Sequence, residues 1–136
     1  MPDQITIEKP RPATPYERLG GLPTLQRITT QFYDLMESDP AYAELRAMHS
    51  ADLSHMRGAL AGFLAGWTGG PRDWFEANPG RCMMSIHKNF PIEADTARQW
   101  ADAMGRAINE TIGESDPEIA KVMTNVLEQM ATGMAP

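Results

Sequence analysis

His87 is the residue whose type and surroundings most suggest chemistry. It follows Met83 and Met84 by four and three residues, within a run (82–89) that is expected to form a short helix. These offsets place both thioethers on or beside the helix face of the imidazole. A neutral imidazole among thioethers and aromatic rings suits an iron ligand in a flat hydrophobic slot. On spacing alone, the favoured interpretation is a partly buried structural histidine that hydrogen-bonds to the backbone.

The other reactive side chains form no recognised site. His49 and His55 belong to neither an HExxH nor a His-x₃-His pattern, and no Glu-x-x-His pair of the di-iron type occurs. No glycine-rich phosphate loop follows an expected strand. Cys82 lacks the surroundings of a nucleophile. As the single cysteine, it excludes an intramolecular disulfide and a multi-cysteine zinc site.

Two aromatic residues carry hydrogen-bonding groups that could act in a pocket. Tyr33 adjoins Phe32, and Trp100 begins an apolar helix stripe. Each is also consistent with a core residue whose polar group has found a partner. The ten methionines could suggest a thioether copper site, but they are spread along helix stripes and so favour core packing.

The composition is that of one ordinary globular domain. The chain has 136 residues, of which 42% are hydrophobic and 22% charged, which is enough for a single core. A net charge of −6 argues against nucleic acid or an anionic membrane surface as partner. No stretch approaches the roughly 20 apolar residues of a membrane span, and the N-terminus lacks the features of a signal peptide. A soluble cytoplasmic protein is therefore expected.

Apolar residues recur at three- and four-residue spacing along four segments, which predicts four long helices. The stripes run over 25–36, 53–67, 100–112 and 119–130. Short helices are expected over 41–48 and 82–89, whereas 71–82 is expected to be a loop because it is rich in proline and glycine. No segment alternates with a period of two, so the predicted class is all-α. Residues 1–14 are expected to form an irregular extension and 15–136 one domain.

Several short motifs, taken in their order along the chain, resemble the truncated haemoglobins, and specifically group II of that family. The motifs are Tyr16-Glu17-Arg18-Leu19-Gly20-Gly21, Phe32-Tyr33, Trp67-Thr68-Gly69-Gly70-Pro71, His87-Lys88-Asn89-Phe90 and Trp100. Each motif is weak alone, but the ordered set, with Trp100 thirteen residues after His87, is specific. The likeness runs from about Tyr16 to the C-terminus. It implies a globin-like, two-over-two helical sandwich around one haem b.

The resemblance implies a set of haem contacts. His87 matches the proximal iron ligand. Many group II members carry arginines just before that histidine, where this chain has Met84 and Ile86. Pairing with the haem propionates would then fall to Arg81 or Lys88. The implied contacts are His87, Phe32, Phe63, Leu60, Met84, Arg81 and Lys88.

A second set of residues is implied on the ligand-binding side. Tyr33 matches the tyrosine whose hydroxyl donates to a bound ligand, and Trp100 matches a tryptophan whose indole N–H points into the same pocket. Met56 falls on the inner face of the helix expected over 53–67, where many group II members have a smaller residue. His49 falls where this branch carries Phe, Tyr or His. It could add a third donor, occupy the sixth iron site, or hydrogen-bond to water.

Two functions fit the implied pocket. The first is reversible binding of O₂, CO or NO, with slow release because donors in a dry pocket stabilise a ligand that gains negative charge on binding. The second is a redox enzyme that oxidises NO or reduces peroxide. The sequence shows no flavin or NADH site, so this enzyme would need a separate reductase as partner. A haem-free helical interaction module is a third alternative, and a monomer or weak homodimer is expected.

Overall fold

A computed structural model describes residues 14–49, 51–79 and 92–134. The long helices are α3 (Leu22–Ser38), α5 (Ser54–Trp67), α8 (Ala94–Ile112) and α9 (Pro117–Thr132). The shorter elements are α2 (Pro15–Leu19), η1 (Pro40–Tyr42), α4 (Ala43–Ala47) and α6 (Asp73–Ala77). These ranges contain no strand, which confirms the all-α prediction. None of the described helices is both long and apolar enough to cross a membrane.

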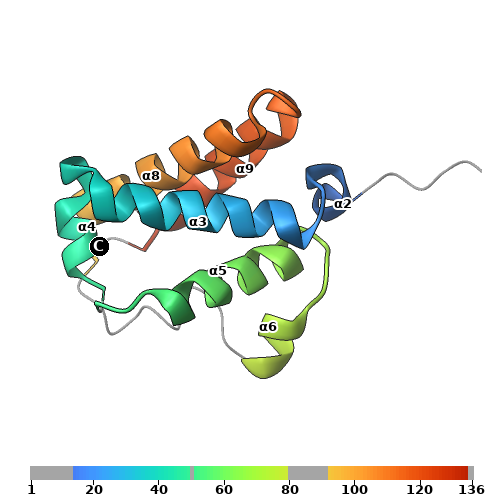
Figure 1. The fold of residues 1–136 in the computed structure, drawn as a ribbon, viewed down its shortest axis with the longest axis horizontal. Helices are drawn as coiled ribbons and strands as arrows, with labels where there is room; N and C mark the ends of the chain where they lie inside the picture. The colour runs from blue at the N-terminus through green and yellow to red at the C-terminus, as the bar shows by residue number, and fades with distance from the viewer. Residues whose placement is uncertain (1–13, 50, 80–91, 135–136) are drawn as a thin grey trace, which may run out of the picture.

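The long helices stack as two pairs (Figure 1). α8 packs along α9, while α3 lies against both α5 and α8, so that α3 and α5 form one layer and α8 and α9 the other. The apolar stripes predicted from the sequence face the interface between these layers. Leu25, Ile28 and Phe32 of α3, Leu64 of α5 and Ile108 of α8 are fully buried. Removing this apolar surface from water is the main force that holds the layers together.

The two glycine pairs of the sequence motifs meet at Tyr16. The Tyr16 hydroxyl accepts a hydrogen bond from the Leu22 N–H at 3.0 Å, which ties α2 to the start of α3. Gly20 and Gly21 connect the two helices with φ values of 102° and 76°, a region that side chains disfavour. A Cβ at Gly70 would lie 2.4 Å from the Tyr16 ring. Glycine is therefore required both for the turn and for the close approach.

The starts of α9 and α2 follow local capping rules. α9 begins at Pro117, directly after Asp116, whose carboxylate accepts a hydrogen bond from the Ile119 N–H at 3.2 Å. This arrangement was predicted from the Asp-Pro pair. Of the extension predicted over 1–14, only Thr14 lies within the described residues. Its hydroxyl accepts a hydrogen bond from the Glu17 N–H and so caps α2.

The clearest difference from the sequence prediction is α6, which forms in a segment expected to be a loop. Trp74 and Phe75 pack onto α5, with ring centroids 5.5 Å and 5.6 Å from that of Phe63. Glycines on α5 make room for them. A Cβ at Gly62 would lie 3.3 Å from the Trp74 Cβ, and one at Gly66 would lie 2.6 Å from the Phe75 ring. Tertiary packing on α5 therefore stabilises a helix that local propensity does not predict.

Gly58 is exposed in α5, and a Cβ there would meet nothing within 4 Å. We expect Gly58→Ala to raise the free energy of unfolding by about 0.5–1 kcal/mol, because alanine lowers the backbone entropy of the unfolded chain. Urea denaturation followed by circular dichroism measures the change. Gly66→Ala is the matched control and should destabilise the protein, since the new methyl group collides with the Phe75 ring. Equal effects of the two substitutions would contradict this account.

Candidate functional site

A cavity of about 500 Å³ is lined by residues from both helix layers and from α4 and α6. Five lining residues carry polar side-chain groups: Tyr33, His49, Trp74, Thr96 and Trp100. The remaining lining residues are apolar: Leu45, Met48, Met56, Ala59, Leu60, Phe63, Leu64, Ile92, Ala97, Leu127, Met130, Ala131 and Met134. A mostly apolar hollow with few polar groups is typical of a site for a small apolar ligand or cofactor.

Tyr33 reaches the cavity from α3 and is only 2% exposed. Burial raises the pKa of its phenol to about 12, although the nearby Arg57 guanidinium partly opposes the rise. That guanidinium lies 5.5 Å from the centre of the Tyr33 ring and is paired with Asp34 and Glu37. At neutral pH the phenol is therefore uncharged and keeps its proton for donation to a hydrogen-bond acceptor.

Trp100 enters the cavity wall from α8, on the other layer. Phe32 packs edge-on against both polar aromatics, with its ring centre 4.8 Å from that of Tyr33 and 5.5 Å from that of Trp100. Phe32 itself is fully buried and lies behind the cavity wall. The sequence resemblance implied that Phe32 is a core aromatic near the cofactor. In the structure it is a core residue that packs against two residues of the cavity wall, and its contact with the cofactor stays a prediction.

Three residues of α5 predicted near the cofactor lie in the cavity wall. Met56, Leu60 and Phe63 recur at four- and three-residue spacing, so that one face of the helix presents all of them. His55, which precedes Met56, is exposed. α5 therefore supplies a continuous apolar wall.

His49 follows α4 and also lines the cavity. Its Nδ1 atom lies 2.9 Å from the Leu45 carbonyl oxygen. Its ring meets the Tyr33 ring edge-on, with centroids 6.3 Å apart. His49 and Tyr33 thus occupy the same region of the wall, as the sequence resemblance implied.

Other parts of the wall were missed by the sequence analysis. Trp74 of α6 lines the cavity, and so do Ile92, Thr96 and Met130. The glycines four residues apart on α5 were the available signal for Trp74, because they leave space for a large neighbour. Met130 was identified only as part of a core stripe, and periodicity cannot separate a core residue from a cavity wall.

The proximal residues lie outside the part of the chain that the structure describes. The undescribed segment 80–91 contains His87, Met84, Arg81 and Lys88, and also Cys82. Their roles, and the short helix expected over 82–89, stay predictions.

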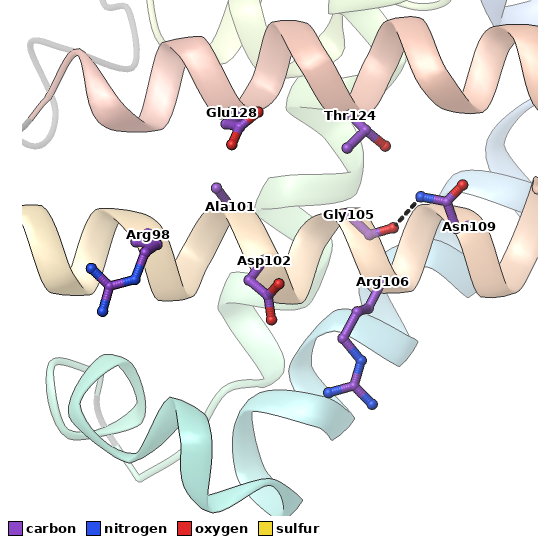
Figure 2. A pocket seen from close by; sticks show the side chains of 8 residues that line it. All are labelled: Arg98, Ala101, Asp102, Gly105, Arg106, Asn109, Thr124 and Glu128. Atoms are coloured by element: carbon purple, nitrogen blue, oxygen red, sulfur yellow. Dashed lines mark hydrogen bonds between the residues drawn. The ribbon is translucent and has the colours of Figure 1, made fainter.

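A second hollow, of about 390 Å³, lies between α8 and α9 (Figure 2). It is lined by Arg98, Ala101, Asp102, Gly105, Arg106 and Asn109 of α8 and by Thr124 and Glu128 of α9. Charged side chains border it, in contrast to the apolar walls of the larger cavity. The larger cavity is therefore the better candidate for an apolar cofactor.

The raised pKa of Tyr33 predicts a pH dependence of stability. The unfolded phenol ionises near pH 10, whereas the folded phenol keeps its proton until about pH 12. The contribution of the buried Tyr33 phenol to the free energy of unfolding is therefore fully present below pH 10 and is lost as the pH rises to 12. We expect a loss of about 2–3 kcal/mol in the free energy of unfolding over this range.

Urea denaturation of the wild type and of Tyr33→Phe between pH 8 and pH 12 measures this loss. The wild type should lose more stability than the variant, in which the other ionisable groups act as an internal control. Parallel pH profiles would contradict burial of the Tyr33 phenol.

Comparison with known proteins places this geometry in a family. The model of the bacterial-like globins matches residues 14–135. Comparison with curated protein sequences gives no significant match.

Solved structures extend the family match to the fold. The group II 2-on-2 haemoglobin of Agrobacterium tumefaciens is 29% identical with a TM-score of 0.88, over 95% of this chain and 98% of that chain. The haemoglobin of Chloroflexus aurantiacus is 32% identical with a TM-score of 0.80, over 92% and 99%. The truncated oxygen-avid haemoglobin of Bacillus subtilis is 26% identical with a TM-score of 0.80, over 91% and 100%. The chain belongs to the bacterial-like globins, a haem-binding family, and has the 2-on-2 fold of the truncated haemoglobins, including those of group II.

Proposed function

We propose that the cavity binds haem b, with His87 as the proximal ligand, and that the protein reversibly binds O₂, CO and NO with slow release. The observation that carries the proposal is the mostly apolar cavity, whose wall includes residues with hydrogen-bond donors from two different helices. Tyr33 comes from α3 and Trp100 from α8.

The walls of the cavity fit a flat apolar macrocycle. Its volume of about 500 Å³ is in the range of cofactor sites, and aliphatic, aromatic and thioether side chains form most of its surface. When bound, haem supplies the iron at which a diatomic gas is held. The chain's own contribution is to enclose that gas, to exclude water and to present hydrogen-bond donors.

Tyr33 and Trp100 would supply these donors. The phenol of Tyr33 is neutral at neutral pH and burial raises its pKa further, and an indole N–H can only donate. The edge-on contacts of Phe32 with both rings restrict their movement. A polar ligand that enters the cavity therefore meets donors that are already positioned.

The apolar surroundings increase the value of each donor. In a water-excluded site, a hydrogen bond to a partly charged acceptor contributes about 1.5–3 kcal/mol. A difference of about 1.4 kcal/mol changes an equilibrium constant tenfold. Two such donors are expected to act mainly on the dissociation rate, in line with the oxygen-avid description of the Bacillus subtilis relative.

Stopped-flow measurement of O₂ dissociation tests this function. We expect Tyr33→Phe and Trp100→Phe each to raise the dissociation rate by about 10- to 100-fold, because each removes one donor while keeping an aromatic ring.

Trp67→Phe is the matched control. Trp67 is a half-buried tryptophan of α5 that is not among the residues lining the cavity. Its substitution should leave the dissociation rate within about twofold of wild type, well below the tenfold that about 1.4 kcal/mol produces. Unchanged rates in both the Tyr33 and the Trp100 variants would contradict the proposed role of the donors.

A further inference from the structure

We infer that Gln99 is a positioning residue for the cavity: from α8 it caps α4, and through the Leu45 backbone it fixes the tautomer and orientation of the His49 imidazole. The importance of this arrangement for ligand binding rests on the proposed function. The arrangement itself is a property of the chain that can be measured separately.

The first turn of α4 lacks a capping side chain at its own N-cap residue. The first N–H groups of any helix have no partner within the helix, and a side chain at the N-cap usually provides one. The N-cap of α4 is Tyr42, whose side chain makes no capping hydrogen bond. Instead, the Leu45 N–H in the first turn donates to Gln99 Oε1 at 3.1 Å. Gln99 is 54 residues away along the chain, so α8 supplies the cap.

The amide of Gln99 is itself held in one orientation. Its Nε2 atom donates to Glu44 Oε1 at 2.8 Å. A backbone N–H needs an acceptor and a carboxylate needs a donor, so the oxygen of the amide must face Leu45 and its nitrogen must face Glu44. Both contacts end on α4, and together they fix that short helix against α8.

We call the two contacts of Gln99 with Leu45 and Glu44 the clamp. Leu45 connects this clamp to the cavity. Its carbonyl oxygen lies 2.9 Å from His49 Nδ1. A carbonyl can only accept, so Nδ1 carries the proton, and in the neutral ring Nε2 is an acceptor. The sequence left open that His49 acts as a third donor. The geometry instead assigns the neutral ring a lone pair at Nε2, with the donors of the wall provided by Tyr33 and Trp100.

The next turns of α8 also hold η1, the short helix that directly precedes α4, by side-chain hydrogen bonds. Asp102 accepts a hydrogen bond from the Tyr42 hydroxyl at 2.5 Å, and Arg106 donates to that hydroxyl at 3.1 Å and to Asp39 at 2.8 Å. Figure 2 shows the side chains of Asp102 and Arg106 directed away from α9. One face of α8 therefore holds η1 and α4, while Trp100 of the same helix enters the cavity.

Nitrogen-15 NMR of the His49 ring in the CO-bound ferrous protein tests the inference. In the wild type we expect one neutral tautomer, with Nδ1 protonated and Nε2 unprotonated. Gln99→Leu should lose this pattern, because the Leu45 N–H loses its acceptor and α4 is no longer held. Gln129→Leu, which changes an exposed glutamine of α9, should keep the wild-type pattern.

An exchange variant separates positioning from general packing. Gln99→Glu combined with Glu44→Gln keeps the net charge and reverses the direction of the hydrogen bond between the two side chains. It still offers an acceptor to the Leu45 N–H, so it should restore the wild-type tautomer. A wild-type pattern in folded Gln99→Leu, or a lost pattern in the exchange variant, would overturn the inference.

The same spectra recorded on haem-free protein keep the two proposals apart. Failure to bind haem would refute the proposed function, whereas the tautomer of His49 would still report on the clamp. If the single tautomer is absent from the haem-free protein as well as the CO-bound protein, the positioning role of Gln99 is refuted even though haem binds.

Discussion

The structure depends on keeping an apolar hollow open at the centre of a small helical domain. Protein interiors are normally close-packed, so a cavity of about 500 Å³ between two helix layers, α4 and α6 requires features that hold its walls apart. Several local features shape this cavity. Gly62 and Gly66 let α6 approach α5, and Gly70 receives the Tyr16 ring that joins the ends of the first layer.

The apolar surroundings also determine how the few polar groups in the cavity wall behave. Burial raises the pKa of the Tyr33 phenol, and Phe32 packs against both the phenol ring and the indole of Trp100. These donors come from opposite layers, so their separation depends on how the layers pack. α8 has two tasks in this arrangement. It presents Trp100 to the cavity, and its neighbouring side chains hold η1 and α4 in place.

The sequence predicted those parts of the fold that depend on local pattern. The four long helices follow from apolar residues at three- and four-residue spacing, and the start of α9 follows from Asp116 and Pro117. The family resemblance implied six pocket residues that the structure describes in the cavity wall: Tyr33, Trp100, His49, Met56, Leu60 and Phe63. α6 was missed because packing on α5, rather than its own sequence, makes it helical. The link from Gln99 to His49 was also missed, since it joins residues far apart in the chain through a backbone carbonyl.

The central claim is that this hollow is a haem cavity whose proximal ligand is His87. Titration of the haem-free protein with haemin, followed by visible absorption, tests it most directly. The account predicts saturation at one haem per chain, with a Soret band that shifts when the reduced protein binds CO. His87→Ala, provided that it folds, should lose this protein-specific spectrum. A wild-type spectrum no different from that of free haemin, or an unchanged spectrum in folded His87→Ala, would contradict the account.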